Sequence, residues 1–302
     1  MKVIKYRAVW YIISGTMVGA SIVALIVFGL RLGIDFTGGS LLEVRYPEGV
    51  AIPSASDIKT ILEKEGIPSP LVQLTDQNGA LIRTKDLTEE EHIKVITALN
   101  TAIFEEKKAE ELRFESIGPV IGKELRQKAV YAMALVIALI IAYIAWSFRK
   151  VSKPIASWKY GVIAVVALIH DVGITFGVFA VLGKVMGIEV DLPFIAAALT
   201  VLGYSVNDTI VVFDRIRENL ARQGSGHFEE RIEESIIQTF VRSINTSFTT
   251  LLTLLALFFF GGESIKWFVL ALLVGIGVGT YSSIFIASPL LVSWERFTHK
   301  RG

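Results

Sequence analysis

The sequence predicts an α-helical integral membrane protein with six transmembrane helices and one inserted α+β domain outside the cytoplasm. Of its 302 residues, 52% are hydrophobic, and the mean hydropathy of +0.56 is too high for a soluble domain. The 20% of residues that are charged lie mostly between long apolar stretches. One long polar segment separates the first apolar stretch from the second, which is where the inserted domain is expected.

Six apolar stretches are long enough to cross a bilayer, whose hydrocarbon core of about 30 Å requires about 20 helical residues. We expect spans at residues 8–30, 129–148, 161–183, 190–213, 244–260 and 267–294. The first stretch could instead be a signal peptide, because Lys2, Lys5 and Arg7 precede it. Its apolar region exceeds the roughly 7–15 residues of a signal peptide, so a retained anchor is favoured.

Lysine and arginine are distributed unevenly between the two sides of these spans. The amino terminus, the loop after the second span, residues 214–243 and the tail at 295–302 hold 15 of them, whereas the short opposite loops hold only Lys184 and Lys266. Basic residues in short loops stay on the cytoplasmic side. Both termini are therefore expected in the cytoplasm, and the segment 31–127 outside it.

The outer segment 31–127 carries the signals of a small β-α-β-β-α-β domain. The first strand is indicated by alternation at Leu42, Val44 and Tyr46, and a capping box at Ser54 and Asp57 begins a helix with Ile58, Ile61 and Leu62 that ends near Gly66. Two strands near 71–74 and 80–84 follow, joined at Asn78-Gly79. A second capping box at Thr88 and Glu91 begins a helix with Ile93, Ile96, Leu99 and Ile103 on one side, and alternation at Leu112 and Phe114 indicates the last strand. This order is that of a ferredoxin-like domain. It has no Ser/His/Asp cluster, which favours docking over catalysis.

The cytoplasmic stretch 214–243 alternates Arg with Glu around Ile216, Ile232, Ile236 and Ile237. This pattern predicts amphipathic helices at the membrane surface, separated at Gln223-Gly224-Ser225-Gly226. A solvated connector is the alternative.

A glycine-rich motif stands at the junction of the first span and the outer domain: Gly33-Ile34-Asp35-Phe36-Thr37-Gly38-Gly39-Ser40. Its composition alone favours a linker in which Asp35 turns the chain. Together with the segment 198–219 of the fourth span, which includes Gly203-Tyr204-Ser205-Val206-Asn207-Asp208, it resembles the SecD/SecF family of protein-export membrane proteins. The resemblance covers nearly the whole chain, including Leu168-Ile169-His170-Asp171 and Arg242.

The resemblance implies a subunit that joins SecD as half of a twelve-helix pump of the resistance-nodulation-division type. Such a pump sits in the bacterial cytoplasmic membrane and couples proton flow to the movement of exported polypeptide. Further implied partners are the Sec translocation channel (SecYEG), a YidC-type insertase and membrane lipid. Two alternatives stay open: a non-energised scaffold of the channel or insertase, and a small-molecule or lipid exporter of the same superfamily.

Several functional classes lack their residues in this sequence. There is no GxxxxGK[ST] phosphate loop, HExxH zinc motif or GxSxG elbow, so no hydrolytic enzyme is expected. The net charge of +1 argues against a nucleic-acid surface. Protons are the expected coupling ion and no cofactor is expected, since one charge moved through 100 mV is worth about 2.3 kcal/mol.

Charged groups inside the spans are the candidate coupling residues, because each costs about 2.5–3.5 kcal/mol in the bilayer centre. Asp208, beside Asn207, is either tied to a neighbouring helix or part of a proton path. The resemblance to SecD implies that the acid implicated there in proton movement aligns with Asn207 of this chain. Asn207 and Asp208 would then only line the proton path with polar groups. Arg242 is either a snorkelling arginine or, as the resemblance implies, a partner of the SecD carboxylate that releases it on protonation.

His170 and Asp171 point about 100° apart on a straight helix, so they are not expected to face one ligand. No metal site is expected, because further ligands are missing. Hydrogen bonds between helices are favoured over a proton relay. Gly275 and Gly279 on the sixth span, and Gly203 on the fourth, predict close packing or sliding against a neighbouring helix.

Overall fold

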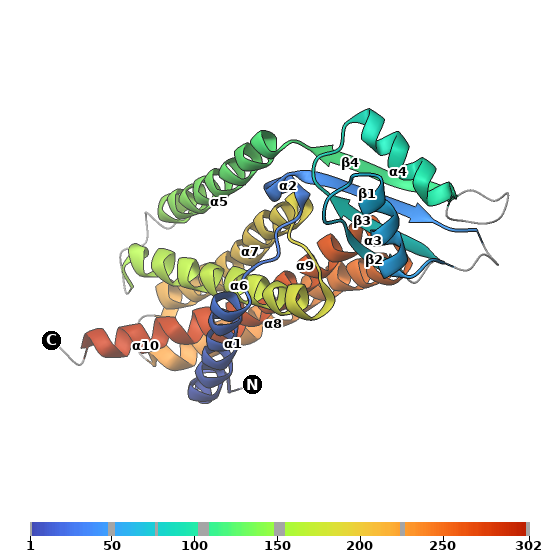
Figure 1. Cartoon of the computed structure of the whole chain (residues 1–302). Coiled ribbons are helices and arrows are strands. Elements are labelled where there is room, and N and C mark those ends of the chain that lie inside the picture. Colours follow the sequence, from blue (N-terminus) through green and yellow to red (C-terminus); the bar gives the residue numbers. More distant parts are fainter. Residues whose placement is uncertain are drawn as a thin grey trace. The chain divides into compact units, whose positions relative to one another are not determined.

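The computed structural model describes residues 2–47, 52–75, 78–101, 109–147, 155–223 and 227–299 (Figure 1). The chain divides into two units, one formed by Met1–Arg31 with Tyr131–Gly302 and the other by Leu32–Val130. Predicted features that lie outside the described residues include the basic loop residues at 149–153, the glycine break at 224–226 and the end of the tail at 300–302.

Within the described residues, six helices are long and apolar enough to cross a membrane. They are α1 (Arg7–Val27), α5 (Pro119–Ser147), α6 (Ser157–Met186), α7 (Leu192–Gln223), α8 (Phe228–Phe260) and α9 (Glu263–Ser282), which continues through a π-helical turn (Ser283–Ala287) into α10 (Ser288–His299). About half or more of the apolar windows of α6, α7 and α9–α10 are buried (56%, 50% and 61%), against 17%, 11% and 17% for α1, α5 and α8. The helices α6, α7 and α9–α10 therefore form the centre of the bundle.

The helices α7 and α8 extend well beyond the predicted spans. Residues 214–223 and 228–243 are helical as predicted, but they do not form separate helices. The residues instead prolong α7 and α8. The reason is packing: Ile216 of α7 and Ile232 and Ile236 of α8 are fully buried in the same apolar core. The α5 helix likewise begins at Pro119, so the end of the segment assigned to the outer domain is already helical.

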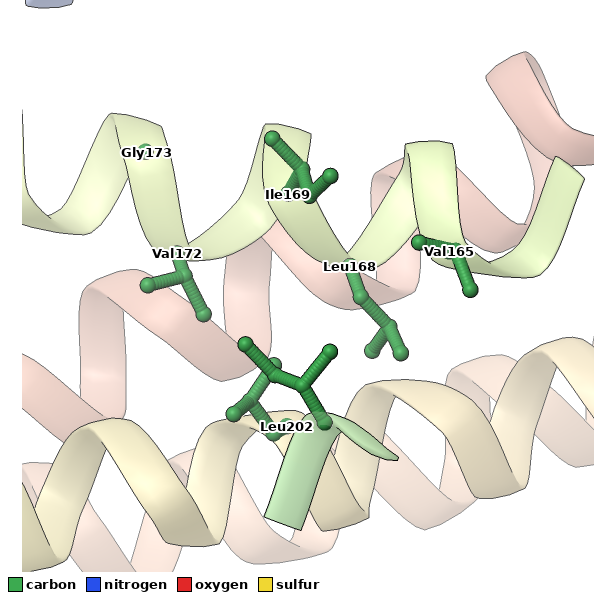
Figure 2. Close-up of a pocket in the computed structure, with 7 residues that line it drawn as sticks. Val165, Leu168, Ile169, Val172, Gly173 and Leu202 are labelled. Carbon is green, nitrogen blue, oxygen red and sulfur yellow. The ribbon is translucent and has the colours of Figure 1, made fainter. Parts of the chain in front are cut away.

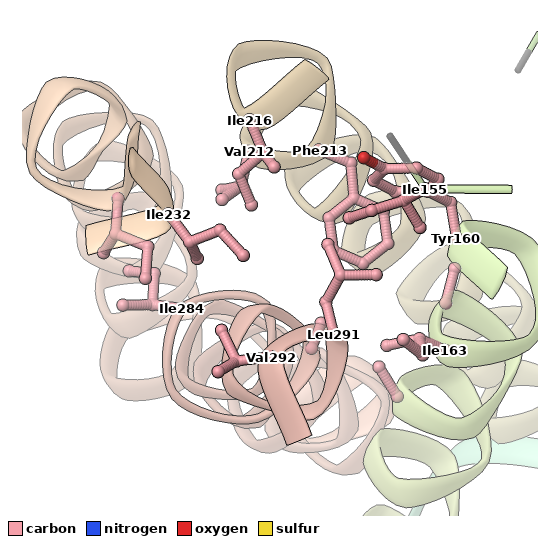
Figure 3. Packing of buried hydrophobic residues seen from close by; sticks show 14 of the residues in the cluster. Ile155, Tyr160, Ile163, Val212, Phe213, Ile216, Ile232, Ile284, Leu291 and Val292 are labelled. Carbon is pink, nitrogen blue, oxygen red and sulfur yellow. The ribbon is translucent and has the colours of Figure 1, made fainter. Parts of the chain in front are cut away.

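The core of the bundle joins α6, α7, α8 and α10 (Figure 3). Tyr160 of α6 meets Phe213 of α7 edge to face, with ring centroids 5.2 Å apart. Figure 3 shows Ile232 of α8 facing the space between Val212 and Val292. Because large apolar side chains fill this region, α7 and α8 are held against α10.

The outer unit is built on a four-stranded sheet. Its elements are β1 (Gly39–Arg45), α3 (Ala55–Lys64), β2 (Leu71–Thr75), β3 (Gly79–Thr84), α4 (Glu89–Thr101) and β4 (Glu110–Ile117), preceded by the short α2 (Ile34–Thr37). The strand order is β2-β3-β1-β4, and every neighbouring pair is antiparallel. Both longer helices cover one face of the sheet, where Ile58 of α3 and Val95 of α4 share a core with Val44.

Local signals in this domain fold as the sequence predicts. Both capping boxes form, since the backbone N–H of Asp57 donates to Ser54 Oγ (3.2 Å) and that of Glu91 donates to Thr88 Oγ1 (3.3 Å). Asn78 takes the left-handed conformation (φ +57°) in the β2–β3 turn.

The predicted apolar face of α4 is wrong at Ile93, which is 56% exposed, and Ile103 lies outside the described residues. Val95 and Leu99 are buried instead. The helix is rotated because His92, one turn before Val95, stacks on Phe114 of β4 at a centroid distance of 3.8 Å.

Candidate functional site

Small residues line the contact between α7 and α9. A Cβ atom built on Gly275 would overlap the side chain of Val201, and one on Gly279 would lie 3.0 Å from Ser205 Cβ. Residues four apart share a helix face, so the two glycines present one smooth strip to α7. The predicted strip on the sixth span therefore lies directly against the fourth.

Gly203 lies elsewhere on α7. No atom of the described residues would come within 4 Å of a Cβ at this position. Close packing of Gly203 within this chain, one possibility raised by the sequence, is thus not found, because it is on the exposed side of α7 with Asn207.

Asp171 of α6 is the centre of a buried polar cluster. The carboxylate is completely inaccessible to solvent and accepts hydrogen bonds from Ser282 Oγ of α9 (2.8 Å) and from Ser205 Oγ of α7. His170 Nδ1 lies 2.8 Å from its other oxygen. One side chain thereby joins three helices, and the hydrogen bonds between helices expected for Asp171 are present.

His170 and Asp171 touch each other directly, although their helical positions predict divergent side chains. Cβ directions diverge by about 100°, but the long imidazole reaches back to the carboxylate. His170 Nε2 is buried and has no hydrogen-bond partner among the described residues. Nor do those residues contain three His, Asp or Glu side chains grouped to hold a metal ion.

Serine and threonine residues complete the polar interior, and the sequence alone gives no reason to single out Ser205, Ser282 or Thr209. Thr209 Oγ1 of α7 lies 2.8 Å from Ser283 Oγ, at the first residue of the π-helical turn. Such turns inside α-helices are frequent at functional sites. Ser205 and Thr209 do lie on the Asp208 side of α7, but serine and threonine are too common in such helices for this placement to identify them.

Asp208 of α7 is held by one hydrogen bond. Its Oδ1 accepts from Ser243 Oγ of α8 (2.6 Å), and the residue is only 7% exposed. Its Oδ2 is buried without a partner among the described residues. A buried carboxylate oxygen normally has a donor, so this atom marks a position where a proton or a donor could bind.

Arg242 precedes Ser243 on α8 and is exposed. It is close enough to act electrostatically on Asp208, yet no ion pair joins these two described residues. Asn207, next to Asp208, is exposed as well. The structure thus places Arg242 and Asp208 near each other at the contact of α7 with α8, while Asn207 faces away from the chain's own core.

The glycine-rich motif has a defined conformation. Gly33 precedes the single turn α2, which contains Asp35 and the buried Phe36. Gly38 and Gly39 have φ angles of +75° and +123°, and a Cβ on Gly39 would lie 2.6 Å from the carbonyl oxygen of Thr84. Side chains are therefore excluded at both positions.

Crowding around Gly38 gives the motif its role in the outer unit. A Cβ on Gly38 would lie 2.7 Å from Pro119 Cα, and one on Gly122 would lie 2.8 Å from Gly38 N. The motif is therefore the place where the first strand and the first turns of α5 pass in close backbone contact, rather than a loose linker.

A separate cavity of about 210 Å³ lies between α5, α6 and α7 (Figure 2). Leu168 and Val172 of α6 point toward Leu202 of α7 there. The lining residues are all apolar, so this cavity offers no group to hold a proton or a polar ligand.

The chain is similar to membrane proteins of protein export. Residues 96–297 match the family described as protein export membrane protein SecD/SecF, C-terminal, and residues 23–46, which contain the glycine-rich motif, match the SecD/SecF GG motif. A protein translocase subunit SecF from Thermobaculum terrenum is 44% identical, with 97% of this chain and 93% of the relative covered. The subunit of the same name from Haemophilus influenzae is 41% identical, with 94% and 82% covered.

Longer proteins match the chain over only part of their own length. Protein translocase subunit SecDF from Thermus thermophilus is 38% identical over 94% of this chain but only 37% of its own length. A crystal structure of SecDF from Thermus, described as a translocon-associated membrane protein, matches with a TM-score of 0.84 and 34% identity over 98% of this chain. This chain spans 39% of that solved chain.

Proposed function

The chain belongs to the SecD/SecF family of protein-export membrane proteins, and we propose that it works with SecD, using the proton motive force in the late translocation of polypeptides across the bacterial cytoplasmic membrane. Full-length relatives named as translocase subunits support the protein-export role. Protons as coupling ion, the cytoplasmic membrane and cytoplasmic termini belong to the proposal. The Sec channel and a YidC-type insertase are its further partners.

Exposed polar residues in the membrane-spanning helices support a helical partner. Thr200 and Asn207 on α7 and Asn245 and Thr249 on α8 are exposed within these segments. Polar groups at membrane depth normally face protein or water rather than lipid. The remaining length of the fused SecDF relative supports SecD as the partner that covers them in a twelve-helix bundle.

The observation that carries proton coupling is the half-partnered carboxylate of Asp208. Its free oxygen is buried, and Arg242 acts on it without pairing. Protonation would remove the negative charge of Asp208 that acts on Arg242 across the contact of α7 with α8. The arginine would then be free to pair with a carboxylate of SecD, and the exchange would move α8 relative to its neighbours.

We assign the outer domain a ferredoxin-like fold and a mechanical rather than a catalytic role. The element order β-α-β-β-α-β and the strand order β2-β3-β1-β4 support this assignment. The close backbone contact at Gly38 and Gly39 supports transmission of movement, because a tightly packed junction leaves little room for the helix and the sheet to move independently.

The test is release of an exported protein from sealed vesicles with and without a proton gradient. Arg242→Met is expected to abolish the gradient-dependent part while leaving abundance and assembly with SecD unchanged. Arg217→Met is the control, since Arg217 pairs with Asp214 on the exposed side of α7. Normal gradient-dependent release by Arg242→Met would refute the coupling role. Gradient-independent release by an intact complex would favour the scaffold.

A further inference from the structure

The two edges of the outer sheet differ in how well they resist the addition of another strand. Edge strands expose unpaired backbone groups, and proteins protect them with charges, bulges or prolines. The β4 edge carries Glu110, Glu111, Arg113 and Glu115, and its pairing with β1 is interrupted by a bulge at Glu43 and Val44. The β4 edge is therefore protected in two ways.

The β2 edge has neither protection. Its sequence, Leu71-Val72-Gln73-Leu74-Thr75, contains no charge and no proline, and its register with β3 is unbroken. Among the described residues its backbone forms hydrogen bonds only with β3. Five residues is close to the average strand length of about 5–6, so shortness does not protect it either.

Apolar side chains flank this edge on both faces of the sheet. Leu71 is 58% exposed and Leu74 is 43% exposed. Leu74 pairs with Ala80, whose side chain is in the core, while Leu71 pairs with Arg83 on the opposite face. A strand added beside β2 would thus meet one leucine on each face, as well as the free backbone groups between them.

We propose that β2 is a docking edge for an extended polypeptide, which pairs with it as a fifth strand. Backbone pairing does not depend on the sequence of the guest, and an uncharged edge repels neither acidic nor basic segments. These properties fit a substrate of many sequences in an unfolded state. The inference rests on the proposed export function and names the surface that meets the exported chain.

Disulfide cross-linking tests the proposal directly, because the chain contains no cysteine. A translocating polypeptide is arrested in vesicles that contain the full chain and SecD, and single cysteines are placed along the polypeptide. Leu74→Cys is compared with Leu112→Cys on β4, a matched control that is 39% exposed. We expect cross-links to Leu74→Cys at every second polypeptide position, because side chains alternate along a strand, and few cross-links to Leu112→Cys.

A second variant tests the edge without a cysteine at it. Gln73→Lys gives β2 the kind of charge that protects the β4 edge and should lower cross-linking to Leu71→Cys by about threefold, a change of the size that single cross-strand contacts contribute. Four outcomes would overturn the proposal: equal cross-linking at the two edges, no alternation along the polypeptide, a disulfide between two copies of the chain, or pairing of β2 with SecD in the absence of polypeptide. If polypeptide cross-links elsewhere on the chain and release stays gradient-dependent, only this inference fails.

Discussion

Two carboxylates in the helical bundle have opposite surroundings. Asp171 has no exposed surface, and three side chains, one each from α6, α7 and α9, form hydrogen bonds with it. Asp208 is almost as deeply buried but has a single donor, Ser243, and one oxygen with no partner among the described residues. The residue type is the same, but the number of filled acceptor positions differs.

This difference separates a structural role from a variable one. A carboxylate with all its donors in place resists change, because any movement of one helix leaves several buried polar groups unpaired. A carboxylate with one vacant oxygen can gain a proton or a donor at little cost to the surrounding packing. Asp171 therefore joins α6, α7 and α9 by hydrogen bonds, and the half-partnered Asp208 lies at the contact of α7 with α8.

The largest expected effect comes from removing the filled carboxylate. Asp171→Leu leaves the hydroxyls of Ser205 and Ser282 and the His170 ring without their acceptor, at about 1–3 kcal/mol for each group. We expect a loss of folded protein from the membrane and a lower unfolding temperature in detergent. Asp171→Asn keeps an acceptor oxygen and should lose less. Wild-type stability of Asp171→Leu would show that the cluster does not fix the helices.

A smaller loss is expected when a larger side chain is placed on the glycine strip that α9 presents to α7. Gly279→Leu must displace Ser205 and disturb the carboxylate of Asp171, and overpacking of this kind typically costs about 1–3 kcal/mol. Gly203→Leu is the matched control, because no described atom is near that position. Unfolding temperature should fall only for Gly279→Leu, whereas Gly203→Leu should reduce co-purification with SecD if SecD covers this face. Equal unfolding temperatures for the two variants would contradict the packing argument.

Much of this architecture could be predicted from local sequence. Length and hydropathy suffice for the six spans, and capping residues such as Ser54 and Asp57 define helix starts in the outer domain. The location of the helical residues 214–243 could not be predicted, because the same amphipathic pattern suits a helix at the membrane surface and a helix packed against another helix. Burial of Ile216 against α8 decides between them, and that contact is not local in sequence.

The candidate site could be predicted only in part. Charged residues in apolar spans draw attention to Asp171 and Asp208, but their hydrogen-bond partners are serines, which are common and uncharged. Ser205, Ser243 and Ser282 acquire their roles only when helices distant in sequence are brought together. The contact of His170 with Asp171 escapes helical geometry, because that geometry gives the direction of Cβ and not the reach of the side chain.

Neutralising the half-partnered carboxylate should leave stability nearly unchanged. Asp208→Asn keeps an oxygen for Ser243 and removes a buried charge, so the unfolding temperature should stay close to that of the wild type. Gradient-dependent release should nevertheless be lost, because an amide side chain does not take up a proton near neutral pH. Ser243→Ala is the control for the hydrogen bond alone, with an expected cost of about 1 kcal/mol. Undiminished gradient-dependent release by Asp208→Asn would remove Asp208 from the proton path.

The smallest effect concerns an unpartnered buried oxygen outside the membrane. The Tyr46 hydroxyl in the outer domain has no hydrogen-bond partner among the described residues, and burial raises its pKa from 10.0 to about 12. A group whose pKa is raised on folding contributes its stability below the unfolded value and loses it as the pH rises. The domain should therefore lose stability between pH 10 and 12, by about 1 kcal/mol at pH 11.

Tyr46→Phe removes this pH dependence and breaks no hydrogen bond, so stability at pH 7 should be unchanged or slightly higher and release should be unaffected. Unfolding of the outer domain in the full chain can be followed with a dye on Lys64→Cys, because the chain has no other cysteine. Asp208→Asn is expected to impair release. If Tyr46→Phe impaired release as well, a buried oxygen without a hydrogen-bond partner would not be enough to identify the coupling residue. Normal release by Tyr46→Phe leaves the position of Asp208, beside Arg242 in the spanning helices, as what distinguishes it.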